Sequence, residues 1–257
     1  MNTEEILIYD QNNEGLGIGK LNNIVVFVPY SLKNELVYIK IIKKNKNFYE
    51  GYPVKFKKIS KERQKVLCKY YYKCGGCSIM HQLYKYQLEF KKNKVINNLS
   101  HIANIKINDE IDIVYDRELN YRNHITLSVD KTNIGFYKAQ TKKIVDISEC
   151  LIANEKTNKC IKEIKEFLNK NSDNSITKIS IKAYETILIN VLCNDFNLIN
   201  EFKNSITYDS LYINNEYVDG EKYAVEIIDK FKFKISSLSF FQKNTNITSK
   251  LYEYIKV

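Results

Sequence analysis

Long apolar runs and targeting signals are missing from this sequence. No run of eighteen apolar residues occurs in its 257 residues, so no segment is predicted to span a membrane. The acidic N-terminus, MNTEEILIYD, lacks the basic stretch followed by an apolar stretch that marks a secretory signal. We therefore expect a cytoplasmic protein with no membrane partner, in whose reducing surroundings disulfides are rare.

Glycine and arginine are also scarce. Only eight glycines are present, and Gly15, Gly17 and Gly19 have neither the G-x-G-x-x-G spacing nor the following helix of a dinucleotide site. We interpret them as turn and bulge glycines. Only three of the 40 basic residues are arginine, and the net charge is +10. That charge is compatible with a nucleic-acid partner, but the abundance of Lys, Asn, Ile and Tyr also fits the codon bias of an A/T-rich genome. Charge alone does not decide between them.

The first 58 residues are predicted to form a small β-barrel. Short apolar or alternating stretches, at 24–28, 35–44 and 52–59, are separated by glycine-containing turns. Several short strands in so few residues are typical of a barrel.

Residues 59–235 are predicted to form an α+β domain with mostly antiparallel strands. Apolar residues at helical spacing predict helices over 81–102 and 154–170. Residues 236–257 contain a third predicted helix, 245–255, and suit the entrance to a further α/β domain. The predicted domains are therefore 1–58, 59–235 and 236–257.

The cysteines are concentrated in one stretch. Three of the six, Cys68, Cys74 and Cys77, lie within CKYYYKCGGC. The Gly-Gly pair lets the backbone turn tightly enough for two thiolates to converge. The alternatives are a disulfide, a redox pair, a zinc site, an iron–sulfur cluster or coincidence. The reducing compartment argues against the disulfide, and the thioredoxin-type pair lacks its βαβ context.

A fourth ligand has to come from elsewhere in the chain. Cys160, in a predicted helix, and Cys193, at a strand end, fit burial as small apolar side chains. Cys150 lies in a strand-to-helix turn, from which its side chain can project toward another segment, so it is the expected fourth ligand. Three clustered cysteines and one distant one favour a [4Fe–4S] cluster over zinc, which stays an alternative. His81 and His101 each stand alone, which favours structural or surface roles.

A set of segments, taken in order, resembles the RNA uracil-5-methyltransferases. These are Cys68-x5-CGGC, YRNHITL, GFYKAQTKKIVDISEC and SFFQKN, and the match is closest to the iron–sulfur type that modifies 23S ribosomal RNA. The resemblance implies an RNA-gripping TRAM barrel over 1–58. It also implies a [4Fe–4S] cluster on Cys68, Cys74, Cys77 and Cys150, which agrees with the choice of Cys150 above.

The resemblance further implies that S-adenosylmethionine is the methyl donor, with Gln242 in FFQ-x-N contacting it. In this family a cysteine thiolate adds to C6 of an extruded uridine, C5 accepts the methyl group, and a carboxylate removes the C5 proton. On this basis the nucleophilic cysteine and the base are expected beyond Val257. The chain is then a truncated, inactive portion that binds RNA and the cluster as a monomer.

Two other functions stay open from the sequence. One is a stand-alone RNA-binding iron–sulfur or zinc protein without methyltransferase activity. The other is a TRAM-bearing radical enzyme, which the x5 cysteine spacing argues against because such enzymes typically use C-x3-C-x2-C.

Four residues are candidates for RNA contact. Arg122 in YRNH is one of few arginines, and arginine suits planar recognition of phosphate or base. Lys138 in GFYKAQ is a second candidate, although a solvated strand end is the favoured interpretation of it. Phe240 and Phe241 could stack on a base, but packing is the simpler role for aromatic side chains.

Overall fold

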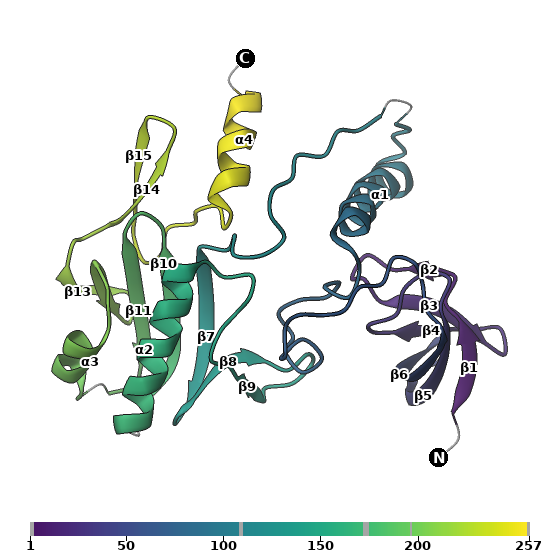
Figure 1. The fold of residues 1–257 in the computed structure, drawn as a ribbon, viewed down its shortest axis with the longest axis horizontal. Helices are drawn as coiled ribbons and strands as arrows, with labels where there is room; N and C mark the ends of the chain where they lie inside the picture. The colour runs from purple at the N-terminus through teal and green to yellow at the C-terminus, as the bar shows by residue number, and fades with distance from the viewer. Residues whose placement is uncertain (1–2, 108–109, 172–174, 196, 256–257) are drawn as a thin grey trace. The chain divides into compact units, whose positions relative to one another are not determined.

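The computed structural model describes residues 3–107, 110–171, 175–195 and 197–255. The chain divides into two compact units (Figure 1). Unit 1 contains Met1–Tyr71 and Cys77–Ile113, and unit 2 contains Tyr72–Gly76 and Val114–Val257. None of the described helices is long and apolar enough to cross a membrane.

Unit 1 is built on a six-stranded sheet. Its strands, in spatial order, are β1 (Glu4–Leu7), β5 (Leu36–Lys44), β6 (Phe48–Lys58), β4 (Ile24–Val28), β3 (Gly17–Leu21) and β2 (Asp10–Gln11). Alternate apolar side chains of these strands form a buried core of Ile6, Ile8, Val26, Val28, Val37 and Ile39. This alternation is the pattern of strands that bury one face, because successive side chains point to opposite sides.

The glycines near the start of the chain divide into two kinds. Gly15 has φ +84° and makes a turn, as predicted. Gly17 and Gly19 instead lie inside β3, where the core approaches the backbone closely. A Cβ at Gly19 would lie 2.7 Å from Ile6 Cδ1, so a larger residue would displace the core.

The expected closed barrel is wrong. Hydrogen-bonded pairing in the described residues runs from β1 to β2 without joining these two strands. The edge strand β2 has only two residues, Asp10 and Gln11, and pairs with β3 alone. A strand that short cannot supply the hydrogen bonds that closing the sheet on β1 would require, so the sheet has two edges.

A long helix follows the cysteine-rich segment of unit 1. Helix α1 (Tyr84–Ala103) ends at Asn104, which adopts a left-handed conformation with φ 54°. This is a common way for helices to stop, and asparagine tolerates it better than most residues. In the middle of the helix, Lys94 Nζ donates to the carbonyl oxygen of Asn13 at 2.8 Å. This hydrogen bond ties α1 to the turn before β3.

Unit 2 is built on a seven-stranded sheet. Its strands, in spatial order, are β13 (Glu216–Gly220), β12 (Ser210–Ile213), β11 (Ile187–Cys193), β10 (Ile176–Ala183), β7 (His124–Asp130), β8 (Asn133–Tyr137) and β9 (Ile144–Asp146). All neighbours are antiparallel except β11 and β12. This agrees with the mostly antiparallel α+β prediction for the region.

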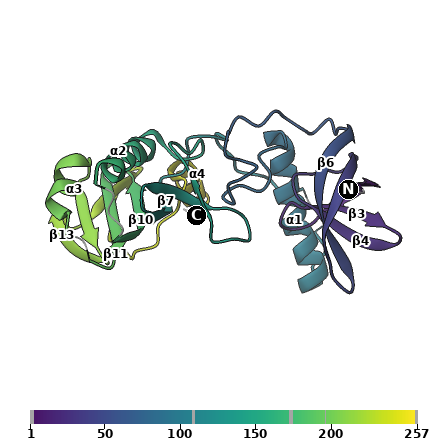
Figure 2. The ribbon, with the colours of Figure 1, turned by 90° about the horizontal axis from the view of Figure 1, so that it is seen from below.

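Two helices lie against this sheet. Helix α2 (Glu155–Asn171) covers one face (Figures 1 and 2) and buries the side chains of Thr157, Cys160, Ile161, Ile164, Phe167 and Leu168. Helix α3 (Ile199–Ser205) packs beside it through Phe202, whose ring meets that of Phe167 edge-on at 5.1 Å.

The end of the chain is part of unit 2. A hairpin of β14 (Ala224–Ile228) and β15 (Phe231–Ile235) lies beside helix α4 (Thr245–Ile255) (Figure 1). Thr245 Oγ1 donates to Glu226 Oε2 at 2.7 Å, and the rings of Phe233 and Tyr252 lie 6.2 Å apart. The last described residues therefore pack on the β14–β15 hairpin of unit 2.

Candidate functional site

Two segments far apart in the sequence lie side by side in unit 2. One is YRNH, at 121–124, and the other is SFFQKN, at 239–244. Arg122 forms an isolated antiparallel bridge with Asn244 and a parallel one with Ala153. The backbone N–H of Asn123 donates to the carbonyl oxygen of Lys243 at 3.0 Å. The structure thus brings together Arg122 and the segment of Gln242, two of the residues predicted to bind RNA and cofactor.

The buried side chain of Asn123 links the YRNH segment to the SFFQKN segment and to Thr245. It is only 2% exposed, and its side-chain amide donates to the carbonyl oxygen of Gln242 at 3.2 Å and to Thr245 Oγ1 at 3.1 Å. Thr245 in turn donates to the buried carboxylate of Glu226. Burial raises the pKa of Glu226, and the Thr245 hydrogen bond partly offsets that rise. The backbone of Gln242 is therefore fixed, while its side chain is exposed.

A buried lysine holds the residues just before this segment. Lys182 on β10 is 2% exposed, and its Nζ donates to the carbonyl oxygens of Ser236, Ser237 and Ser239 at 2.8, 2.8 and 2.7 Å. Burial lowers the pKa of Lys182 to about 8.

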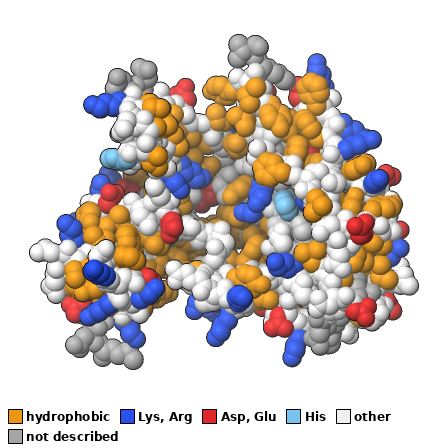
Figure 3. Space-filling view, turned by 180° about the vertical axis from the view of Figure 1, so that it is seen from behind, with side chains coloured by type: hydrophobic (Ala, Val, Ile, Leu, Met, Phe, Trp, Pro, Cys, Tyr) orange, Lys and Arg blue, Asp and Glu red, His pale blue; other side chains and the backbone are white. Residues whose placement is uncertain are grey.

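The two phenylalanines of the segment have different surroundings. Phe241 packs in an aromatic cluster, with ring centroids 5.7 Å from Tyr184 and 5.3 Å from Phe233. Phe240 is 78% exposed. Packing, the simpler role, accounts for Phe241 but not for Phe240. Apolar side chains lie close to Lys and Arg side chains on the molecular face in Figure 3.

Positive charge gathers around the YRNH segment. Burial lowers the pKa of His124 to about 4, with further contributions from Lys182, Lys243 and Arg122. Burial and the Arg122 charge also lower the pKa of Lys243. A histidine surrounded by cations stays neutral at pH 7, so the positive charge comes from the lysines and the arginine. Such a group attracts an anionic ligand.

Lys138 lies elsewhere in unit 2. It is exposed in the turn between β8 and β9, beside an open cavity of about 540 Å³ lined by Gly75 and residues 137–142. The N–H of Gly75 donates to the carbonyl oxygen of Tyr137 at 2.9 Å, and a Cβ at Gly75 would lie 2.9 Å from that same oxygen. Glycine is therefore required there by the close approach of the backbone at Tyr137.

The four predicted cluster cysteines are divided between the two units. Cys68 and Cys77 belong to unit 1, whereas Cys74 and Cys150 belong to unit 2. Within the described residues, no three His, Cys, Asp or Glu side chains are grouped so as to hold a metal ion. The backbone of Cys150 is held by Asn158, which accepts from its N–H at 2.8 Å and donates to its carbonyl oxygen at 3.1 Å. The cluster on these four cysteines therefore stays a prediction from their spacing in the sequence.

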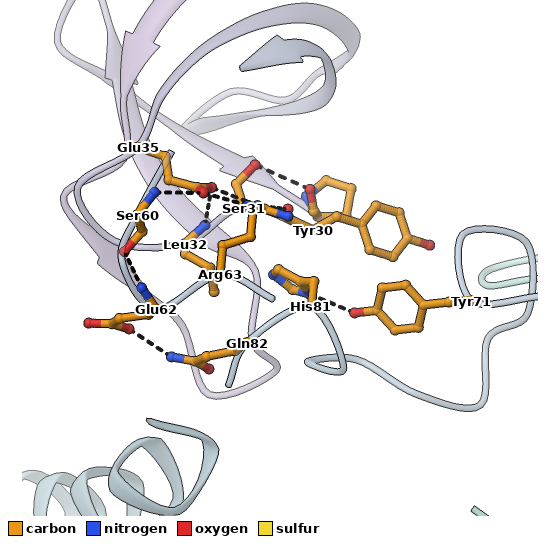
Figure 4. Close-up of polar contacts among 11 residues, drawn as sticks. Tyr30, Ser31, Leu32, Glu35, Ser60, Glu62, Arg63, Tyr71, His81 and Gln82 are labelled. Carbon is orange, nitrogen blue, oxygen red and sulfur yellow. Dashed lines mark hydrogen bonds and ion pairs between the residues drawn. The ribbon is translucent and has the colours of Figure 1, made fainter. Parts of the chain in front are cut away.

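His81 takes part in a buried polar cluster of unit 1 (Figure 4). Its Nδ1 lies 2.7 Å from the hydroxyl of Tyr71, which also lies 2.7 Å from the carbonyl oxygen of Ser78. The Tyr71 hydroxyl has one proton to donate, and Ser78 can only accept, so the hydrogen-bond pattern assigns the proton on His81 to Nδ1. Burial, with a smaller contribution from Arg63, lowers the pKa of His81 to about 3. His81 is structural here, and His101 is exposed on α1.

Three residues of the site were missed from the sequence: Asn123, Lys182 and Glu226. Asn123 stands inside the YRNH segment, but its partner Gln242 lies 119 residues away, and no local pattern relates them. Lys182 offers a weak signal in the sequence, because it stands between the apolar residues Ile181 and Ala183 in a predicted strand. All three side chains are buried in the structure.

These features have counterparts in known proteins. Residues 2–54 match the TRAM domain family. The crystal structure of Pyrococcus abyssi tRNA (uracil-54, C5)-methyltransferase in complex with S-adenosyl-L-homocysteine has the same fold over 97% of this chain and 64% of its own, with a TM-score of 0.75 and 24% sequence identity. The chain therefore combines a TRAM domain with the fold of that part of a methyltransferase structure.

The sequence relatives are RNA methyltransferases. An uncharacterized RNA methyltransferase of Clostridium acetobutylicum is 34% identical over 98% of this chain and 63% of its own length. Those of Caldanaerobacter subterraneus and Aquifex aeolicus are 32% and 31% identical, over 97% and 94% of this chain and 63% and 60% of their own. The chain spans about three fifths of the length of these relatives.

These matches correct one expectation and leave another without support. The fold of a methyltransferase structure extends over nearly the whole chain, so the description of a barrel, a cluster domain and a mere domain entrance is wrong. The expectation that the chain is inactive finds no support in relatives that match it over nearly its full length.

Proposed function

We propose that this chain acts in the S-adenosylmethionine-dependent methylation of uridine C5 in RNA. The TRAM match and the RNA methyltransferase relatives support an RNA substrate. The observation that carries the proposal is the backbone pairing of YRNH with SFFQKN, because it brings the segment of Arg122 beside the segment that contains Phe240, Gln242 and Lys243.

Each residue of that surface has a role suited to its chemistry. Arg122 and Lys243 supply positive charge for the RNA backbone. Phe240 offers a ring on which a base can stack, a contact worth about 1–3 kcal/mol per base. Gln242 contacts S-adenosylmethionine through its exposed side chain. Lys138 is a second, separate point of RNA contact.

The RNA part of the proposal is tested by binding measurements on matched variants. Arg122→Ala is expected to weaken binding of a fluorescent RNA by about tenfold, the size of a lost charged contact. Arg117→Ala removes another partly exposed arginine, whose side chain pairs with Asp116, and serves as the control. Phe240→Ala is likewise paired with Leu238→Ala, which removes a side chain of similar exposure, 77%. Equal losses in variant and control would contradict the roles given to Arg122 and Phe240.

The RNA class and the methyl transfer need a separate experiment. We propose 23S ribosomal RNA as the substrate and a monomeric protein. Transfer of labelled methyl from S-adenosylmethionine to 23S fragments should exceed transfer to transfer RNA, and Gln242→Ala should reduce cofactor binding. A preference for transfer RNA would overturn the substrate, and absence of transfer to any RNA would overturn the activity for this chain. A molecular mass of a dimer, measured by light scattering, would contradict the proposed monomeric state.

We also keep the proposal that Cys68, Cys74, Cys77 and Cys150 ligate a [4Fe–4S] cluster, on the evidence of their spacing in the sequence. Protein purified without oxygen should be brown, with about four iron atoms per chain, and Cys77→Ser should lose the colour. Cys193→Ser is the control, since Cys193 is also partly exposed but lies outside the pattern. Stoichiometric zinc in a colourless protein would replace the cluster by a zinc site. If such a protein bound RNA without transferring methyl groups, the stand-alone RNA-binding alternative would hold.

A further inference from the structure

The segment that carries Phe240 and Gln242 is held at both of its ends. Before Phe240, the carbonyl oxygens of Ser236, Ser237 and Ser239 bind one ammonium group, that of Lys182. After Phe240, the ring of Phe241 is packed and the carbonyl oxygen of Gln242 is bound. Phe240 lies between these fixed points, yet its side chain is 78% exposed.

An ammonium group is chemically suited to the first of these attachments. It has three donors and no acceptor, so it can bind three converging carbonyl oxygens at once. In the described part of the chain, the structure gives Lys182 no carboxylate partner, and burying an unpaired charge is costly unless other groups solvate it. The three serine carbonyls supply that solvation. The lysine and the loop therefore depend on each other.

We propose that Lys182 is a positioning residue that fixes the 236–239 loop and so presents Phe240 and Gln242 in one conformation to their ligands. The inference rests on the proposed function for its ligands, but the fixing of the loop can be tested without them. Holding a contact residue in its bound conformation before binding reduces the entropy lost on association.

Lys182 also makes the loop sensitive to pH. Above a pH of about 8, the pKa that burial gives Lys182, its amine becomes neutral and retains only two N–H donors for three carbonyls. The groups facing it do not titrate in that range. His124, its partner on β7, has a pKa lowered to about 4, and its partner on β11 is Leu188. Burial and the charge of Arg122 lower the pKa of Lys243, so Lys243 needs a control of its own.

The absence of tryptophan from the chain allows a direct test. In Phe240→Trp, the single tryptophan reports the mobility of the loop through its fluorescence anisotropy. We expect high anisotropy at pH 7 and a fall with a midpoint near pH 8. Adding Lys182→Met should give low anisotropy at all pH values and no transition. Adding Lys182→Arg, which keeps charge and donors, should restore part of the restraint without the transition.

Two control variants show whether the transition depends on Lys182 or on other lysines nearby. Lys178→Met removes an exposed lysine of the same strand and should leave the transition in place, as should Lys243→Met. Equal anisotropy with and without Lys182, or a transition that survives its removal, would overturn the proposal. If Lys182→Met does not fold, Lys182→Gln, which keeps two N–H donors but no charge, takes its place, and anisotropy equal to that of the protein with Lys182 would again overturn the proposal.

The same proteins separate this inference from the proposed function. If the loop is restrained and shows a Lys182-dependent transition but the protein binds no RNA, the fixing of the loop by Lys182 is supported and the proposed function is rejected. RNA binding unaffected by Lys182→Met, despite a released loop, would reject the positioning role.

Discussion

Buried charged side chains fix local structure in unit 1 (Figure 4). Glu35 is fully buried, and its carboxylate accepts hydrogen bonds from Arg63, at 2.6 and 2.7 Å, and from the backbone N–H groups of Leu32 and Ser60. The Arg63 guanidinium also lies 4.3 Å from the ring centroid of Phe56. One ion pair thereby ties the β4–β5 loop to the segment that follows β6.

Removing the arginine should therefore be costly. Arg63→Ala leaves the Glu35 carboxylate buried without its cation, and we expect a loss of about 3–5 kcal/mol in the free energy of unfolding of unit 1. Urea unfolding followed by hydrogen exchange in β4 measures it. Lys57→Ala, which breaks the exposed pair with Glu5, is the control and should change little. Similar small effects in both variants would contradict the role of the buried pair.

His81 should make unit 1 sensitive to acid. Its pKa, lowered to about 3 in the folded protein, lies below the ordinary value of 6.5. Between these two pH values His81 is protonated in the unfolded chain but neutral in the folded chain. Stability from this site is complete above pH 6.5 and falls as the pH drops toward 3. Between pH 7 and 5 the loss is about 2 kcal/mol.

The His81→Phe variant should lose less stability over the same interval. The variant cannot bind the proton, and the contribution of His124, common to both proteins, cancels in the comparison. Urea midpoints of unit 1 at pH 7, 6 and 5 give the difference. His101→Gln, at an exposed position, should behave like the wild type. Parallel pH profiles for His81→Phe and the wild type would mean that the folded protein accepts the proton.

At the scale of elements, the two long helices differ in how they are held. Helix α2 buries six side chains, whereas none of the residues of α1, which the structure describes throughout, is buried. We expect amides of α1 to exchange with deuterium faster than those of α2 by about two orders of magnitude or more, because opening α1 exposes little apolar surface. Peptide-level exchange at pH 7 measures the ratio, and comparable protection would show that α1 is held by more than its described contacts.

The sequence pattern located several elements well. Residues 24–28 and 245–255 were predicted with the bounds that β4 and α4 have, because apolar spacing and flanking turns agree there. The hairpin of β10 and β11 around Glu185 was also predicted. Strands β1, β2, β3 and β12–β14 and helix α3 were missed, because they are short and several of the strands carry charged or polar residues on exposed edges.

At the scale of the molecule, the site itself could be predicted only in part. The resemblance identified Arg122 and Gln242, and the structure pairs their segments. Nothing local in the sequence indicates that a buried lysine at 182 binds three carbonyls 54 to 57 residues away. Contacts of that kind depend on how sheet and loop fold together. The division into domains at 58 and 235 stays a prediction.

The net charge of +10 predicts salt-dependent RNA binding by the whole chain. The logarithm of the association constant should fall linearly with the logarithm of salt concentration, by about 0.7 per phosphate neutralised on a single strand. If Arg122 contacts a phosphate, Arg122→Ala should reduce the slope by about 0.7, and Arg117→Ala should leave it unchanged. Fluorescence anisotropy between 50 and 400 mM KCl, a range of about one decade, measures both. A slope near zero would mean that the excess lysine is unrelated to RNA.

The path of the chain between the two units has a consequence for the inheritance of this architecture. Residues 72–76 belong to unit 2 but are flanked on both sides by residues of unit 1, so the backbone passes between the units three times, after residues 71, 76 and 113. A single cut after residue 113 separates 114–257 from unit 1 but leaves residues 72–76 of unit 2 attached to unit 1. Genetic exchange with one breakpoint therefore transfers neither unit whole, and exchange of the complete unit 2 requires breakpoints after residues 71, 76 and 113.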